Sequence, residues 1–178
     1  ENATDCLQKG VDLVHDRYVD HPLVSTCFAP HSTYVVSDAA FRDLRVLADQ
    51  LDARIQIHLH ESAEEVRQSL QSTGKRPFER LLDLGLVNSS LLAVHAVHMT
   101  DDELARMADA GVAVAHCPHS NLKLASGIAR VAAMQAAGVT VALGTDGAAS
   151  NNTLDLLGEM RTAALLAKAA SGDAAALP

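Results

Sequence analysis

The sequence predicts an α/β protein built around a parallel β-sheet. Short apolar runs alternate with amphipathic stretches along most of its 178 residues, which is typical of repeated strand–helix units. The chain is 48% hydrophobic and 20% charged, and these values favour an ordinary globular domain over a disordered one. We expect five strands, over residues 23–29, 54–59, 91–97, 112–115 and 139–143.

Helical periodicity and capping residues fill the stretches between these strands. Ser37 is a candidate N-cap for a helix reaching residue 51, and Thr100 and Glu103 have the spacing of a capping box in a helix that Gly111 ends. Two further helices are expected over residues 128–137 and from residue 153 to about residue 170. Apolar side chains also follow helical spacing over residues 5–14, as if the chain began within a helix, so we expect it to be part of a longer protein.

Two architectures fit five strand–helix units. One is a (β/α)₈ barrel, although a closed barrel typically takes about 250 residues. The other is an open, doubly wound sheet. Both bind ligands at the carboxyl ends of the strands, so the residues that end each apolar run are the candidates for chemistry.

Charge and cysteine content limit the binding partners and the cellular compartment that we expect for the protein. Fourteen Lys and Arg against 22 Asp and Glu give a net charge of −8, which disfavours nucleic acid and anionic membrane surfaces. No apolar run approaches the roughly 18 residues of a membrane span. Cys6, Cys27 and Cys117 are odd in number and widely spaced, so they predict no disulfide framework and favour a reducing, cytoplasmic location.

Histidines and acids gather at the predicted strand ends. Imidazole nitrogen and carboxylate oxygen suit Zn²⁺ and its first-row neighbours, and a catalytic site gathers such ligands while leaving one position open. One strand-end histidine alone is more often structural, but the set together favours a metal site whose ligands come from different strands. These residues are His31, His58, His60, Glu61, His95, His98, His116, His119 and Asp146.

Ordinary structural roles compete with this interpretation. Asp146 follows Gly-Thr and could be a turn former or a helix N-cap. Glu61 could be a first-turn acid favoured by the helix dipole, as we expect for Glu64 and Glu65. Ser150 could belong to a polar loop that leads into a helix. His15 and His21 are expected in surface or turn positions, and we add no other role for them.

The order of these motifs resembles the amidohydrolase superfamily. The resemblance is carried by His31, His58-Leu59-His60-Glu61, His95, Val97-His98, Ser120-Asn121-Leu122-Lys123-Leu124 and Gly144-Thr145-Asp146-Gly147-Ala148-Ala149-Ser150-Asn151-Asn152. Within the superfamily, residues 23–166 are most similar to the methylthioadenosine/S-adenosylhomocysteine deaminases and the related s-triazine chlorohydrolases. The resemblance implies a (β/α)₈ TIM-type barrel, with this chain supplying about strands four to eight and their helices. Residues 1–178 would then be the carboxyl-terminal part of a single barrel domain.

The resemblance also implies a role for several residues. His58 and Asp146 would be metal ligands, Glu61 the general acid/base, and His95 a catalytic contact to the activated water or the substrate. Asp146 would also help to orient that water, and His31 and Ser150 would touch the substrate. The cofactor would be one divalent metal, with zinc expected and iron as the alternative. His60, His98, His116 and His119 receive no catalytic role.

One part of the superfamily pattern is missing from this sequence. Such enzymes take two further ligands from a His-x-His at the end of the first strand. His58 and His60 could point to one face of a strand, but Asp146 would then come too few strands later. We therefore expect the first strands, with that motif, to lie in the missing N-terminal part of the barrel.

The implied activity is metal-dependent hydrolytic deamination of an aminopurine nucleoside such as S-adenosylhomocysteine, methylthioadenosine or adenosine, through attack by a metal-activated water. The alternatives are a triazine chlorohydrolase, a deaminase of a triazine, guanine or pterin ring, and an imidazolone or hydantoin ring hydrolase. A metal-free α/β interaction module is the non-enzyme alternative. The expected partner is a small-molecule substrate. The oligomeric state is left open, and a homo-oligomer is one alternative.

Overall fold

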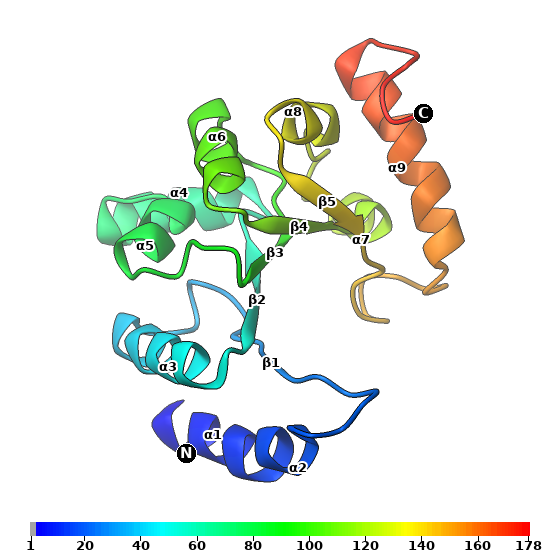
Figure 1. Cartoon of the computed structure of the whole chain (residues 1–178). Coiled ribbons are helices and arrows are strands. Elements are labelled where there is room, and N and C mark those ends of the chain that lie inside the picture. The colour runs from blue at the N-terminus through cyan, green and yellow to red at the C-terminus, as the bar shows by residue number, and fades with distance from the viewer. Residues whose placement is uncertain (1–2) are drawn as a thin grey trace.

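The computed structural model describes residues 3–178 as one parallel sheet with helices around it (Figure 1). The five strands are β1 (Cys27–Phe28), β2 (Arg54–Leu59), β3 (Leu91–His95), β4 (Ala113–His116) and β5 (Thr140–Leu143). The helices are α1 (Ala3–Gly10), η1 (Val11–His15), α2 (Asp16–Tyr18), α3 (Asp38–Leu51), α4 (Ala63–Thr73), α5 (Pro77–Asp83), α6 (Asp101–Asp109), α7 (Pro118–Lys123), α8 (Val131–Ala136) and α9 (Leu156–Ser171).

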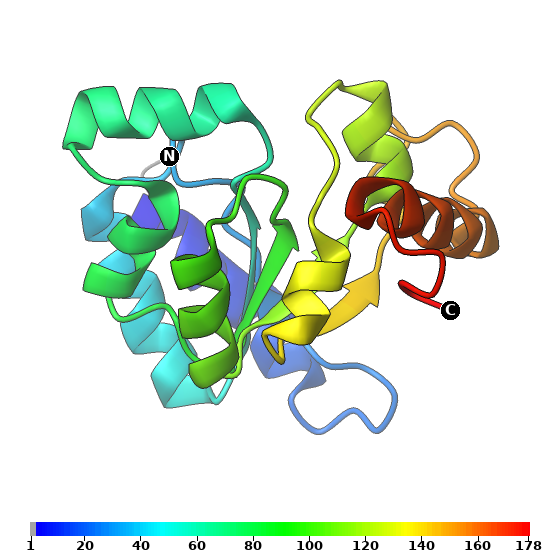
Figure 2. The ribbon, with the colours of Figure 1, turned by 90° about the horizontal axis from the view of Figure 1, so that it is seen from above.

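The strand order decides between the two predicted architectures. Neighbouring strands follow the chain without a reversal, β1-β2-β3-β4-β5, and every pair is parallel. Helices α3, α4, α5, α6 and α8 lie on the outer side of a curved sheet, as the two views show (Figures 1 and 2). A doubly wound sheet reverses its order and carries helices on both faces, so this arrangement is that of a barrel wall.

The core lies between the sheet and these outer helices. Ile55, Ile57 and Leu59 alternate along β2 with the more exposed Arg54, Gln56 and His58. The buried set packs against apolar side chains of the helices, because successive strand residues point to opposite faces. The helix side chains of this cluster include Phe41, Leu44, Phe78, Leu81, Leu104, Met107 and Met134.

Several predicted helix ends are confirmed by their capping contacts. The Ser37 hydroxyl accepts from the backbone N–H of Ala40 and caps α3. Thr100 and Glu103 form both hydrogen bonds of a capping box at the start of α6, and Gly111 follows that helix with φ of 71°. The helical spacing expected near the start of the chain corresponds to α1, η1 and α2, which follow one another without a break.

Other predicted boundaries are wrong, for local reasons. The first strand is shorter than predicted, because His21 accepts the backbone N–H groups of Leu23 and Val24 in a turn. The third predicted strand stops at His95, where φ turns positive.

Two helices also begin later than predicted. Helix α8 begins at Val131 because residues 125–130 are irregular, with positive φ at Ala125 and Gly127. Helix α9 begins at Leu156 because Leu154 has φ of 49° and Asp155 is the N-cap.

Within residues 3–178, no helix combines the length and the apolar character needed to cross a membrane.

Candidate active site

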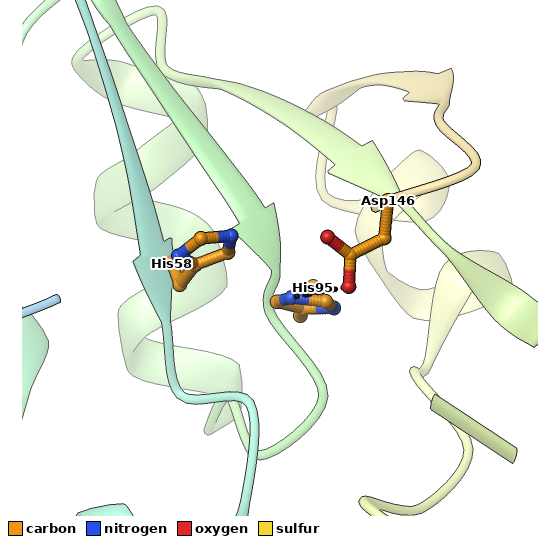
Figure 3. Close-up of side chains that lie close together, drawn as sticks. All are labelled: His58, His95 and Asp146. Atoms are coloured by element: carbon orange, nitrogen blue, oxygen red, sulfur yellow. Dashed lines mark ion pairs between the residues drawn. The ribbon is translucent and has the colours of Figure 1, made fainter. Parts of the chain in front are cut away.

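Side chains from three strand ends converge at the carboxyl edge of the sheet. His58 lies in β2, His95 ends β3, and Asp146 follows β5. One potential ligand atom from each of the three lies within 4.8 Å of the others. Figure 3 shows the three side chains close together. His95 is buried and the other two are half-buried. The structure thus brings together the residues for which the sequence predicted a metal and catalytic role.

The backbone at two of these strand ends has an uncommon conformation. His95 and Ala96 have φ of 72° and 49°, and Asp146 has φ of 60°. Left-handed backbone is unfavourable for residues other than glycine, although Asp tolerates it better than most. Such conformations concentrate at functional sites, where the surrounding structure holds them in place. At His95 this conformation ends the regular strand, whereas Asp146 lies three residues after β5, and Figure 3 shows both side chains beside His58.

Hydrogen bonds fix the orientation of both imidazole rings. Nδ1–H of His58 donates to the carbonyl oxygen of His31 over 2.6 Å, and Nδ1–H of His95 donates to Oδ1 of Asn121 over 2.8 Å. The two rings stack with centroids 5.2 Å apart. Each ring therefore keeps Nε2 as its free nitrogen. Ligating histidines commonly have such a partner on the other nitrogen, which selects the tautomer.

Carboxylates flank the free nitrogen of His95. Its Nε2 lies 3.7 Å from Oε2 of Glu61 and 3.8 Å from Oδ2 of Asp146. Burial lowers the pKa of His95, while the two carboxylates and the hydrogen bond to Asn121 act to raise it. The net direction is downward, so the neutral imidazole, which can bind a metal, is favoured.

The Asp146 carboxylate is held by three donors. Oδ2 accepts from the hydroxyls of Ser120 at 2.7 Å and Ser150 at 2.8 Å, and Oδ1 accepts from the backbone N–H of Gly147 at 2.8 Å. Partial burial acts to raise the pKa of Asp146, but the hydrogen bonds from Ser120, Ser150 and Gly147 outweigh it and lower the pKa. The side chain is therefore an anionic ligand candidate whose orientation is set in advance.

Glu61 approaches the cluster of His58, His95 and Asp146, called the donor cluster below, instead of serving as a first-turn acid of α4. It precedes the N-cap of α4, Ser62, and its Oε1 accepts from the Ser126 hydroxyl at 3.4 Å. Its backbone N–H donates to Oε2 of Glu65 at 2.8 Å. The exposed Glu64 pairs with Arg67 outside the site, as expected of a helix-start acid.

The two predicted substrate contacts lie beside the cluster. The exposed His31 ring has its centroid 4.9 Å from that of His58. Ser150 is buried, and its hydroxyl is bound to Asp146. A contact of either residue with a substrate stays a prediction.

Of the remaining strand-end histidines, His60, His98 and His119 form hydrogen bonds outside the site. Buried His60 accepts from the backbone N–H of Phe78 at 3.0 Å, and burial lowers its pKa to about 4. His60 is therefore not part of the donor cluster, consistent with rejecting a His58-x-His60 ligand pair. Nε2–H of His98 donates to the carbonyl oxygen of Ser126 at 2.7 Å. Burial also lowers the pKa of His116 to about 4.

Several residues that contact the site received no role from the sequence. Ser120 and Asn121 lie in a segment that carries the family resemblance, but only the fold shows that they hold Asp146 and His95. Ser126 had no local signal, because it lies 65 residues from Glu61 in the sequence. Glu65 was expected only as a first-turn acid of the following helix, and its bond to the backbone N–H of Glu61 is additional.

The donor set fits a divalent metal of the zinc type. Two imidazole nitrogens and a carboxylate oxygen are ligands that zinc prefers, and each has a hydrogen-bond partner that orients it. His58, His95 and Asp146 are the residues in the described part of the chain that could hold such an ion.

Comparison with known proteins agrees with this geometry. A model of the amidohydrolase family matches residues 13–177. The chain belongs to the amidohydrolase family. A 5-methylthioadenosine/S-adenosylhomocysteine deaminase of Teredinibacter turnerae is 46% identical over 177 residues, which cover 99% of this chain and 40% of the relative.

Solved structures of this family share the fold. An adenosine deaminase from Xanthomonas campestris with bound zinc has a TM-score of 0.95 and 52% identity, covering 98% of this chain and 40% of that one. An atrazine chlorohydrolase from Arthrobacter aurescens complexed with zinc has a TM-score of 0.88 and 29% identity, covering 95% and 38%. The predicted barrel class is thereby confirmed. The chain spans about 40% of the length of these relatives.

Proposed function

We propose that the complete gene product is a metal-dependent deaminase that removes the amino group of an aminopurine nucleoside by hydrolysis. The observation that carries this proposal is the convergence of Glu61 on the His58, His95 and Asp146 cluster. The names of the Teredinibacter and Xanthomonas relatives support an adenosine-type substrate.

His58, His95 and Asp146 would hold one divalent metal in this proposal. Zinc is favoured by the donor set and by the zinc bound in two of the similar structures. A bound metal of this kind lowers the pKa of a coordinated water toward about 7. The hydroxyls of Ser120 and Ser150 donate to Asp146, and these hydrogen bonds favour its ionised form and hold its carboxylate beside His58 and His95.

Glu61 would move the protons of the reaction. Its carboxylate takes a proton from the attacking water and delivers it to a ring nitrogen of the purine, while the water oxygen bonds to the carbon that carries the amino group. The second proton of the water then passes from the new hydroxyl to the amino group, the carbon–nitrogen bond breaks, and ammonia leaves while the oxygen stays on the ring as a carbonyl. General acid/base transfer of this kind is typically worth about 10²- to 10⁴-fold in rate. The 3.7 Å approach of Glu61 to Nε2 of His95 supports this role.

His31 and Ser150 are proposed as substrate contacts at the edge of this site. A site that hydrogen-bonds a substrate hydroxyl or amine rejects analogues that lack it, because its own polar groups would lose their partners. Both residues lie beside the donor cluster, on separate segments of the chain.

A parallel assay of four substrates tests the proposal. The complete gene product would be given S-adenosylhomocysteine, methylthioadenosine, adenosine and a chlorotriazine, and ammonia and chloride release would be followed. We expect the highest kcat/KM for ammonia release from one of the nucleosides. A higher kcat/KM for chloride release would favour the chlorohydrolase alternative, which the similarity to the Arthrobacter enzyme supports. If none of the nucleosides releases ammonia but guanine or a pterin, tested in a second assay, does, the nucleoside assignment alone is refuted.

The metal content separates an enzyme from an interaction module. Purified complete gene product, expressed with added zinc, should contain close to one divalent metal per site by mass spectrometry. A metal-free, inactive protein would refute the proposed function altogether.

A further inference from the structure

Three consecutive residues at the start of α7 connect the site to the last helix. Ser120 donates to Asp146, and Asn121 accepts from His95, so each of the two forms a hydrogen bond with a proposed metal ligand. The residue before them, His119, contacts α9 instead. The position of His119 therefore sets where Ser120 and Asn121 reach the site.

Glu159 of α9 is the residue that binds His119. Its side chain is 0% exposed. Oε2 accepts from the backbone N–H of His119 at 3.0 Å, and Oε1 lies 2.9 Å from its ring nitrogen Nδ1. One turn further along α9, the Thr162 hydroxyl lies 2.7 Å from Nε2 of the same ring.

The same carboxylate also holds the loop that carries Asp146. Oε1 of Glu159 accepts from Nδ2 of Asn151 at 2.5 Å. Asn151 donates in addition to the carbonyl oxygen of Thr145 at 2.9 Å. Asn151 thus joins the residue directly before Asp146 to the buried carboxylate.

We propose that Glu159 is a positioning residue for the metal ligands, acting through His119 on α7 and through Asn151 on the loop after β5. The inference rests on the proposed metal-binding role of His58, His95 and Asp146. Glu159 touches none of these three side chains in the contacts described for the chain.

The chemistry of the network requires a carboxylate. Two N–H donors, the backbone of His119 and the amide of Asn151, bind different oxygens of Glu159, and the ring nitrogen Nδ1 of His119 lies 2.9 Å from Oε1. A glutamine would place its NH₂ group against a donor in either orientation, facing Asn151 or the backbone N–H of His119. The isosteric change Glu159→Gln should therefore displace one of the two segments with almost no change in side-chain volume.

The zinc affinity of the complete gene product tests this inference. The dissociation constant would be measured by competition with a chelator for the wild type and for Glu159→Gln. Partners that orient metal ligands are typically worth about 10- to 100-fold in metal affinity. We expect zinc binding about 10-fold weaker in Glu159→Gln, with kcat recovering toward the wild-type value when zinc is in excess.

Two further variants separate positioning from general destabilisation. Asp155→Ala removes the N-cap of the same helix, and should lower the Tm while leaving the zinc affinity unchanged. Thr162→Val removes the hydroxyl that lies beside Nε2 of His119 and leaves Glu159 unchanged. It should weaken zinc binding about 3-fold. If Glu159→Gln does not fold, the Thr162→Val result decides.

The outcomes also distinguish this inference from the proposed function. Zinc affinity within about 2-fold of the wild type in both Glu159→Gln and Thr162→Val would overturn the positioning role. Equal loss of affinity in Asp155→Ala at the same fall in Tm would overturn it as well. A wild-type protein that binds no zinc would instead refute the proposed function on which the inference rests.

Discussion

Replacing Glu61 with glutamine separates proton transfer from metal binding. The amide has almost the shape of the carboxylate and keeps one oxygen, so it can still accept from the Ser126 hydroxyl, which is the donor 3.4 Å from Oε1. The bond from the backbone N–H of Glu61 to Glu65 does not involve the replaced group. We therefore expect the free energy of unfolding to change by less than about 0.5 kcal/mol.

The expected loss lies in the chemical step. An amide cannot take up and return a proton at neutral pH, so kcat of the complete gene product should fall at least about 100-fold, which corresponds to about 2.7 kcal/mol. The metal content should stay at the wild-type level, because His58, His95 and Asp146 are unchanged. Steady-state ammonia release and metal analysis by mass spectrometry would be run on the same preparation.

Glu64 supplies the matched control three residues away. Its side chain is about half exposed and pairs with Arg67, so Glu64→Gln should leave both kcat and metal content unchanged. Loss of metal together with activity in Glu61→Gln would make Glu61 a ligand. Unchanged activity would show that Glu61 transfers no proton in the reaction and would refute the reasoning.

Three further outcomes are expected. His58→Ala should lower the metal occupancy of the complete gene product well below that of the wild type, and full occupancy by mass spectrometry would exclude His58 as a ligand. The pKa of buried His60 is lowered from 6.5 to about 4, so the unfolded chain binds its proton first and stability should fall as the pH drops from about 6.5 to 4. His60→Gln should flatten that part of a plot of Tm against pH, whereas parallel curves would contradict the assignment. The isolated 178-residue chain should aggregate in light scattering, because apolar side chains such as Leu23 and Leu157 are 90% and 75% exposed and the sheet has two edge strands. A monomer that unfolds cooperatively would show otherwise.

The sequence by itself determined the kind of structure and the residues of the candidate site. Alternating apolar runs predicted the strands, and the capping contacts of Ser37 and Thr100 are local enough to be predicted from the residues alone. The carboxyl ends of parallel strands meet at one edge, which put His58, His95, Asp146 and Glu61 among the candidates, and the resemblance to the amidohydrolase superfamily implied their roles.

Only the tertiary structure showed that the sheet is a barrel wall and which residues hold the site residues in place. Strand order without a reversal is a property of the assembled sheet, and five strand–helix units are compatible with either architecture. The bonds of Ser120 to Asp146 and of Glu159 to Asn151 and His119 join segments that no local pattern links. The positive φ at His95 shortens the third strand where its ring contacts Asn121, and this contact joins residues 26 positions apart.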